Sequence, residues 1–394
     1  MTNEVLQKTT SDEQNISSSN GLEAKSPLLR FRKFTHPWRQ EKLSDFTSRI
    51  MRKNSNNETE LPLTISSKDG LINQVTFFNK KVSSKDLSGY YLLKNGEFAY
   101  NKSYSNGYDF GSIKRLERYE MGALSTLYIC FSLKKHCSDY IKHYFDSLKW
   151  YRQIYVISAE GARNHGLLNV PTDDFFATTH FLSPYIEEQE KIAAFLSLVD
   201  ARIEKQRQLV EALKKYKRGA LSRVFNDVLE TVKLSDISNF ISSTRTLSTT
   251  LNSNKGIYPV YDAAGIAGYI DHYDIDSDYI TIVKDGSGVG RLQKCDKKSS
   301  FIGTLGALVA KNCTTDFLYA VLQTIDFSKF VTGMAIPHIY YRDYKSNLLP
   351  FPSEEKQRAI SQFFKKFDKC IENETQKLSN MLKYKQGLLQ QIFI

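Results

Sequence analysis

The chain has 394 residues, 41% of them hydrophobic and 12% aromatic, a composition that excludes disordered and fibrous proteins and allows two or three buried cores. Its formal net charge of +11 favours a polyanionic partner. The five cysteines have neither metal-type nor disulfide-type spacing, so no zinc site or disulfide framework is predicted.

Residues 1–26 are polar and lack apolar periodicity, which predicts a disordered N-terminal tail. The longest nearly apolar run, residues 121–133, is too short to cross a bilayer, and no apolar signal core begins the chain. We therefore expect a cytoplasmic protein without membrane contact.

Residues 27–183 predict a first α+β domain. Strand-like runs and one helical stretch alternate with turns, the runs being residues 74–78, 90–93, 97–100, 127–133 and 153–158, and the helical stretch residues 139–150. Residues 226–349 have the same texture with more Gly and Asp, and predict a second α+β domain. Its expected strands are residues 269–270, 279–283 and 305–310, and its expected helix is residues 315–324.

Residues 184–225 recur at a distance of 168 positions, within the C-terminal segment 350–394. Fifteen identities in 42 aligned positions indicate an internal duplication. The identical positions of the first copy are Pro184, Glu187, Gln189, Ile192, Phe195, Asp200, Ile203, Glu204, Gln208, Lys215, Tyr216, Lys217, Gly219, Leu221 and Phe225. The motif Lys42-Leu43-Ser44-Asp45 also returns, as Lys233-Leu234-Ser235-Asp236, which makes the first domain about 23 residues longer than the second.

Both repeats are predicted to be long helices. Apolar residues fall at helical spacing, and acidic residues follow the entry prolines, where negative charge complements the helix dipole. One apolar stripe on each of two equal helices is most simply buried by pairing them, as an antiparallel coiled coil related by a pseudo-two-fold axis. Two independent core helices are the alternative, which leaves the resistance of the helices to divergence unexplained.

No catalytic motif was found. The chain contains no phosphate-binding GxxxxGK[ST] loop, no Asn/Asp-Pro-Pro-aromatic tetrapeptide, no HExxH and no GxSxG. The Gly-rich segment 285–290 lacks the third spaced glycine of a dinucleotide site, so a turn between strands is the expected structure, compatible with a backbone that approaches phosphate.

Basic and amide side chains mixed with aromatics occur in loop-like positions, as groove reading in DNA requires. A solvated surface charge is the alternative at any single position, so the clusters are firmer candidates than their members. In the first domain the candidates are Asn101, Lys102, Tyr104, Lys114, Arg115, Arg163, Asn164 and His165; in the second they are Lys284, Ser287, Arg291, Lys294 and His338.

This layout resembles the specificity subunits of type I restriction-modification systems. The helix entries Pro184-Tyr-Ile-Glu-Glu-Gln and Pro352-Ser-Glu-Glu-Lys-Gln, each followed by Ile and Phe, carry the resemblance. The opening Leu29-Arg30-Phe31 and the segment Gly333-Met-Ala-Ile-Pro-His338 also fit the family, whereas Gly161-Ala-Arg-Asn-His165 lacks the Pro-His ending. The resemblance covers residues 27–394 and is specific in the helices and loose within the domains.

The resemblance implies a non-catalytic DNA-binding subunit. Residues 27–183 and 226–349 would be target-recognition domains at opposite ends of the helix pair, each reading half of a bipartite double-stranded DNA target. The helical regions 184–225 and 350–394 would dock two modification subunits, which bind S-adenosylmethionine and methylate adenine N6, and restriction subunits that use ATP and Mg²⁺ would join the complex. The helix residues expected to contact partners are Phe195, Val199, Ile203, Tyr216, Phe363, Phe367, Ile371 and Tyr384.

Two other functions fit the sequence less well. A two-headed coiled-coil adaptor that binds proteins would make the positive charge incidental. An intrinsic methyltransferase would need a cofactor motif, which the chain lacks.

Overall fold

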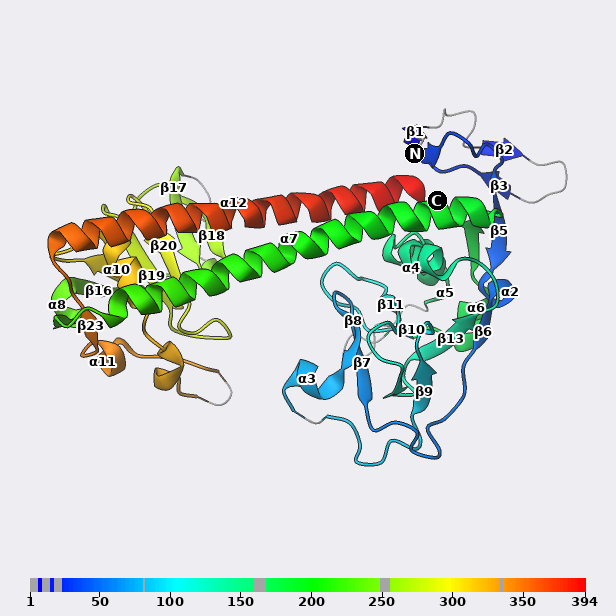
Figure 1. Cartoon of the computed structure of the whole chain (residues 1–394), viewed down its shortest axis with the longest axis horizontal. Helices are drawn as coiled ribbons and strands as arrows, with labels where there is room; N and C mark the ends of the chain where they lie inside the picture. The colour runs from blue at the N-terminus through cyan, green and yellow to red at the C-terminus, as the bar shows by residue number, and fades with distance from the viewer. Residues whose placement is uncertain are drawn as a thin grey trace. The chain divides into compact units, whose positions relative to one another are not determined.

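The computed structural model describes residues 6–8, 15–17, 23–80, 82–158, 168–248, 256–333 and 336–394. They form two compact units (Figure 1): unit 1 comprises Met1–Lys205 and Leu378–Ile394, and unit 2 comprises Gln206–Lys377. Each unit therefore contains part of both repeated segments. None of the helices in these described ranges is long and apolar enough to cross a membrane.

The two repeated segments form long helices, α7 (Ile186–Asn226) and α12 (Glu354–Ile392), as predicted. In unit 1, Lys385 Nζ of α12 lies 2.6 Å from Asp200 Oδ1 of α7. In unit 2, Lys217 of α7 binds Asp368 of α12. Because these lysines and these aspartates are equivalent positions of the duplication, the same contact is made once in each unit. Residues early in α7 thus meet residues late in α12, which confirms the antiparallel pairing.

The described residues of unit 1 form three four-stranded sheets and one two-stranded sheet, with strand orders β11-β10-β13-β6, β8-β7-β12-β9, β14-β5-β3-β2 and β1-β4. Its strands are β1 (Leu6–Lys8), β2 (Asn15–Ser17), β3 (Glu23–Lys25), β4 (Leu29–Phe31), β5 (Trp38–Lys42), β6 (Thr47–Arg49), β7 (Pro62–Ser66), β8 (Gly70–Asn73), β9 (Tyr91–Lys94), β10 (Phe98–Asn101), β11 (Ser112–Arg115), β12 (Met121–Leu124), β13 (Ile129–Leu133) and β14 (Thr179–Leu182). Its short helices are α2 (Leu43–Phe46), α3 (Gln74–Phe78), α4 (Ser138–Asp146), α5 (Tyr151–Ile157) and α6 (Thr172–Ala177).

The first three strands lie in the segment expected to be a disordered tail, residues 1–26. β1 pairs with β4, and β3 pairs with both β2 and β5. The tail therefore contains strand segments that its polar composition did not indicate; its remaining residues, except Ser26, lie outside the described residues.

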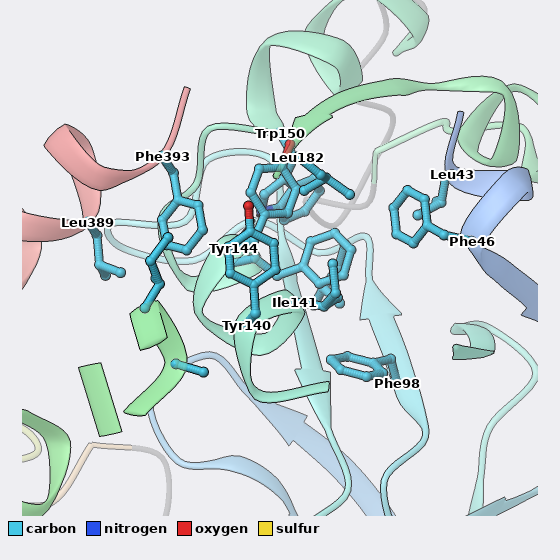
Figure 2. Close-up of a cluster of buried hydrophobic side chains, with 14 of the residues drawn as sticks. Leu43, Phe46, Phe98, Tyr140, Ile141, Tyr144, Trp150, Leu182, Leu389 and Phe393 are labelled. Atoms are coloured by element: carbon cyan, nitrogen blue, oxygen red, sulfur yellow. Dashed lines mark hydrogen bonds between the residues drawn. The ribbon is translucent and has the colours of Figure 1, made fainter. Parts of the chain in front are cut away.

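The core of unit 1 is aromatic and includes the end of the chain. Figure 2 shows Leu389 of α12, and Phe393 just beyond the end of α12, on the side of Tyr140 and Tyr144 of α4. The Phe393 ring centroid lies 5.4 Å from that of Tyr140, 5.7 Å from that of Tyr144 and 6.2 Å from that of Trp38. The last turn of α12 therefore completes the core of unit 1.

Unit 2 contains a four-stranded sheet, β16-β22-β19-β20, a three-stranded sheet, β18-β17-β21, and the pair β15-β23. Its strands are β15 (Thr231–Lys233), β16 (Ser238–Ser242), β17 (Tyr258–Asp262), β18 (Gly265–Ile270), β19 (Tyr279–Val283), β20 (Leu292–Cys295), β21 (Ser300–Phe301), β22 (Leu305–Ala310) and β23 (Leu348–Pro350). Its short helices are α8 (Leu234–Ile237), α10 (Thr315–Leu322), the 3₁₀ helix η1 (Phe327–Phe330) and α11 (Tyr341–Tyr344). Leu221 and Phe225 of α7, equivalent to Leu389 and Phe393, are buried in its core.

The two units share a strand topology that their sequences no longer show. The order β11-β10-β13-β6 in unit 1 corresponds to β20-β19-β22-β16 in unit 2. The parallel pair β7–β12 corresponds to β17–β21, and the Leu-Ser-Asp motif forms α2 in one unit and α8 in the other. Unit 1 adds α3 and β9 between β8 and β10, whereas only residues 271–278 separate β18 from β19.

Two segments expected to be strands are helices. Residues 74–78 form α3 because the Asn73 side chain caps the helix, accepting hydrogen bonds from Val75 N and Thr76 N. The segment 153–158 falls mostly in α5, where Ile154 is buried while the adjacent Tyr155 and Val156 are both exposed. This burial does not alternate as it would in a half-buried strand, so tertiary packing has overridden the β preference of the sequence.

Candidate nucleic-acid interface

Several predicted DNA-binding residues of the two domains lie in or beside equivalent loops. In unit 1, Asn101 is the last residue of β10, and Lys102 and Tyr104 follow in the β10–β11 connection. Lys284, Ser287 and Arg291 lie in the β19–β20 connection of unit 2, which is the corresponding hairpin of the shared topology. Two clusters that were predicted independently from the sequence therefore occupy the same position of the shared topology, one in each unit.

In each unit, a segment from later in that domain contacts the hairpin. In unit 1, Leu168 N donates to Lys102 O at 3.1 Å; in unit 2, Ile339 N donates to Lys284 O at 2.9 Å. His338 also forms an isolated β-bridge with Asp285, which brings the predicted residue His338 to the second hairpin. Arg163, Asn164 and His165 lie outside the described residues.

The hairpin of unit 1 is held in shape by short-range contacts. Asn101 Oδ1 accepts a hydrogen bond from Ser103 N at 3.0 Å, and the backbones of Ser105 and Tyr108 pair with each other. Gly111 has a φ of +77°, and a Cβ at this position would lie 2.0 Å from Asn101 O. Only glycine fits there, because both its backbone conformation and the close approach to Asn101 exclude a side chain.

The hairpin of unit 2 exposes Ser287 and Arg291 and half-buries Lys284. Gly286 and Gly290, with φ of +97° and +84°, turn the chain between β19 and β20. Gly286 N donates to Pro337 O at 2.9 Å, and the Arg291 guanidinium donates to Ala263 O. The Arg291 side chain is therefore held in a fixed orientation at the surface, and a guanidinium of this kind can bind a phosphate or the edge of a guanine.

Lys114 and Arg115 on β11 are engaged in ion pairs. Lys114 Nζ lies 2.7 Å from Asp146 Oδ1 of α4, and Arg115 lies 2.7 Å from Glu117 and 2.6 Å from Asp139. Burial lowers the pKa of Lys114, but Asp146 together with Tyr108 and Asp200 raises it by more, so the net shift of the pKa is upward. Both side chains are charged, and their charges are satisfied within unit 1.

Lys294 of β20 occupies the position on its strand that Lys114 has on β11, and it is engaged in the same way. Its Nζ lies 2.7 Å from Asp316 Oδ1 of α10 and 4.8 Å from the Tyr319 ring centroid. Asp316 also binds Lys365 of α12 at 3.1 Å. Lys294 and Asp316 thus connect strand β20 to helices α10 and α12. The sequence did not indicate this connection.

The predicted partner-contacting residues of the helices divide by exposure. Ile203 is buried, and Phe195 and Val199 pack against the core of unit 1. Tyr216 and Tyr384, at equivalent positions, are 65% and 63% exposed. The others are Phe363, which is exposed, and Phe367 and Ile371, which are half-buried.

In unit 2 these exposed aromatics form a cluster. The ring of Tyr216 stacks on Phe367, with centroids 5.6 Å apart and an interplanar angle of 17°, and Phe363 lies beside Phe367. Such a cluster on a helix surface is typical of protein interfaces.

Residues 226–384 match the family model of the type I restriction modification DNA specificity domain. This segment contains the β19–β20 hairpin and most of α12. By this match, residues 226–384 belong to the type I restriction modification DNA specificity domain family.

A curated relative and solved structures are also similar to this chain. A putative type I specificity subunit of Mycoplasma pneumoniae is 28% identical over 159 residues, which are 38% of this chain and about half, 52%, of that relative. The crystal structure of a type I S subunit from M. genitalium is similar over 91% of this chain and 96% of that chain, with a TM-score of 0.55 and 16% identity.

A second solved structure, from work on the assembly and conformational transition of the type I restriction-modification system, is similar over 90% of this chain and 97% of that chain. Its TM-score is 0.51 and its identity 16%. At this level of identity the likeness shows the fold, which is the predicted α+β architecture with a paired helix.

Proposed function

We propose that this subunit reads a bipartite double-stranded DNA target, one half with each unit, and carries modification subunits on its helices. The observation that supports this most is the equivalence of the β10–β11 and β19–β20 hairpins. Each presents amide, hydroxyl or basic side chains at the same place of a duplicated fold. A duplicated reader with diverged loops suits a target of two different half-sites.

The contacts divide into two kinds. Arg291 and Lys284 in unit 2, and Lys102 in unit 1, supply phosphate contacts or recognition of guanine, while Asn101 is suited to adenine. Arg163, Asn164, His165, Ser287 and His338 complete the predicted sets. Lys114, Arg115 and Lys294 act through the fold instead, because their ion pairs position the strands that carry the hairpins.

The helices are proposed to dock two DNA methyltransferase subunits, one at each repeat. The equivalent exposed tyrosines, Tyr216 and Tyr384, give each repeat an aromatic contact at the same position. Since α7 and α12 are 41 and 39 residues long, they are rigid elements suited to fix the unread spacer between half-sites.

The chemistry is assigned to the partners. The modification subunits would bind S-adenosylmethionine and methylate adenine N6, and restriction subunits would add ATP- and Mg²⁺-dependent translocation and cleavage. The complex would work in the cytoplasm, where its DNA is.

DNA selection by the copurified complex with its modification subunit tests the proposal. We expect enrichment of a two-part sequence, and affinity that falls steeply with salt because lysine and arginine contacts release counterions. Arg291→Gln, in the second hairpin, should change only one half of the enriched sequence, and Lys102→Gln should affect only the other half. An exposed lysine outside both hairpins, Lys356→Gln on α12, serves as control. Binding without sequence preference, or no binding, would favour a protein-binding adaptor.

A further inference from the structure

Unit 1 has a pocket beside its predicted DNA-binding hairpin. Its volume is about 350 Å³, and it is bounded by the turn after β7, by α3 and by the β10–β11 loop. The side chains that define its character are Lys68, Phe77, Asn101, Tyr104 and Asn106. A single nucleobase is a flat heterocycle that needs aromatic faces for stacking and amide or hydroxyl groups for its edge, and this lining provides both.

Two of the aromatic residues at the pocket are open to solvent. Phe77 is 48% exposed and Tyr104 is 60% exposed. Single exposed aromatics are common on protein surfaces, but these two come from separate segments and line the same pocket. The residues that line it include a lysine and no carboxylate, which favours a polyanion over a basic or purely apolar partner.

The pocket is organised before any ligand binds. Ser67 Oγ lies 3.0 Å from Ser105 Oγ and 3.1 Å from Ser112 Oγ, so the turn after β7 is tied to the hairpin. α3 is fixed at its start by the Asn73 cap and is followed by Asn79 in the left-handed conformation. A ligand would therefore meet walls that are already in place, which reduces the entropic cost of binding.

The wall that carries Phe77 is specific to unit 1. α3 lies in the segment between β8 and β10, and the corresponding link in unit 2, residues 271–278, contains no helix among its described residues. The hairpin is common to both units, whereas the pocket is an addition to one of them. Because α3 was added to a hairpin that both units share, we expect it to add a contact with DNA that unit 2 does not make.

We propose that this pocket takes one nucleobase of the first half-site, unstacked from its neighbours, with Phe77 and Tyr104 as its stacking faces. This rests on the proposed DNA-reading function and adds a mode of reading to it. Asn101 and Asn106 would contact the edge of the base, and Lys68 the adjoining phosphate. The preference of the subunit for a base at that position would then also depend on the free energy needed to unstack that base from its neighbours.

Phe77→Ala and Tyr104→Ala test the proposal in the complex with the modification subunit. Phe78→Ala is the matched control, because Phe78 is the next residue of α3, is 43% exposed and does not line the pocket. Since all three side chains are exposed, the variants should fold. We expect the first two to lose roughly tenfold or more in affinity for the target and to relax preference at one position of the first half-site.

Fluorescence of 2-aminopurine gives a direct readout of unstacking. The probe is placed at each position of the first half-site except the methylated adenine, which the modification subunit could displace by itself. We expect a change on binding at one position that Phe77→Ala abolishes and Phe78→Ala keeps. If Phe77→Ala and Tyr104→Ala behave like Phe78→Ala at every position, the pocket proposal is wrong while DNA reading stands. If the wild-type complex shows no sequence selection, both proposals fail.

Discussion

Removing the Phe393 side chain should destabilise unit 1 and leave unit 2 intact. Phe393 is 1% exposed and its ring contacts Trp38, Tyr140 and Tyr144. Truncation of a buried phenylalanine to alanine costs about 3–5 kcal/mol, because apolar contacts are lost and a cavity remains. In a unit of this size, each kcal/mol lowers the melting temperature by about 2–4 °C, so a decrease of about 6–20 °C is expected.

The duplication supplies a matched variant in the other unit. Phe225, at the equivalent position, is 4% exposed and packs on Phe317 with ring centroids 6.1 Å apart. Phe225→Ala should therefore lower the stability of unit 2 by a similar amount. Tyr384→Ala, at an exposed position of α12, should change stability by no more than about 0.5 kcal/mol.

Differential scanning calorimetry of the purified chain, combined with limited proteolysis, measures both effects. Proteolysis at the temperature of the first transition identifies which unit opens. We expect early cleavage within residues 27–183 for Phe393→Ala and within 226–349 for Phe225→Ala. The reasoning is refuted if Phe393→Ala leaves the melting profile unchanged, or if it exposes unit 2 first.

Three further outcomes follow from individual contacts. Asp368→Asn leaves the nearly buried Lys217 without its anionic partner and should destabilise unit 2 by roughly 2–3 kcal/mol, which is less than for a fully buried pair because Asp368 is partly exposed. Urea unfolding measures this loss, with Asp200→Asn as the equivalent change in unit 1. No loss of stability in either variant would contradict the prediction. Burial lowers the pKa of His180 to about 3 and that of His143 to about 4, so below pH 6.5 the unfolded chain binds more protons than the folded chain. Unit 1 should therefore lose about 2 kcal/mol of stability per histidine between pH 6.5 and 5. His180→Gln should reduce this pH dependence of the unfolding free energy, and an unchanged slope would contradict the prediction. Gly111→Ala should distort the β10–β11 hairpin and abolish selection of one half-site, which DNA selection would show as a one-sided motif; an intact two-part motif would show that the hairpin does not read DNA.

The sequence was sufficient to predict the helices and their pairing because the duplication preserved them. Lys217 and Lys385 are equivalent, and so are their partners Asp368 and Asp200. The residues that are identical in the two repeats therefore include residues that pair between the two helices. The helix entries and the Leu-Ser-Asp motif carried the same kind of information. The fold class and the helix pair could therefore be predicted without coordinates.

The interior of the two domains could not be predicted in this way. Lys114, Arg115 and Lys294 were predicted to contact DNA, and their ion pairs were not foreseen. Their carboxylate partners, except for Glu117, lie on helices more than 20 residues away in the chain. Only the fold brings such pairs together. Phe77 was missed for a related reason, since its segment looked like a strand and its pocket includes residues from three separate segments.

The equivalence of the two hairpins was also hidden. Lys102 and Lys284 share no local motif, yet they are the first residues after β10 and β19. The central strands β10 and β19 are buried at nearly every position, and mostly apolar residues of different identity fill those positions in the two units. Divergence of the exposed loops is then free to change what each unit binds.

Mapping of N6-methyladenine by single-molecule sequencing is the most direct test of the proposed role. A methylation-free host would express this chain with its own modification subunit, and a control host the modification subunit alone. We expect a bipartite motif, methylated in both halves, that appears only when this chain is present. A stable complex of the two proteins that produces no sequence-specific methylation would contradict the assignment of target selection to this chain.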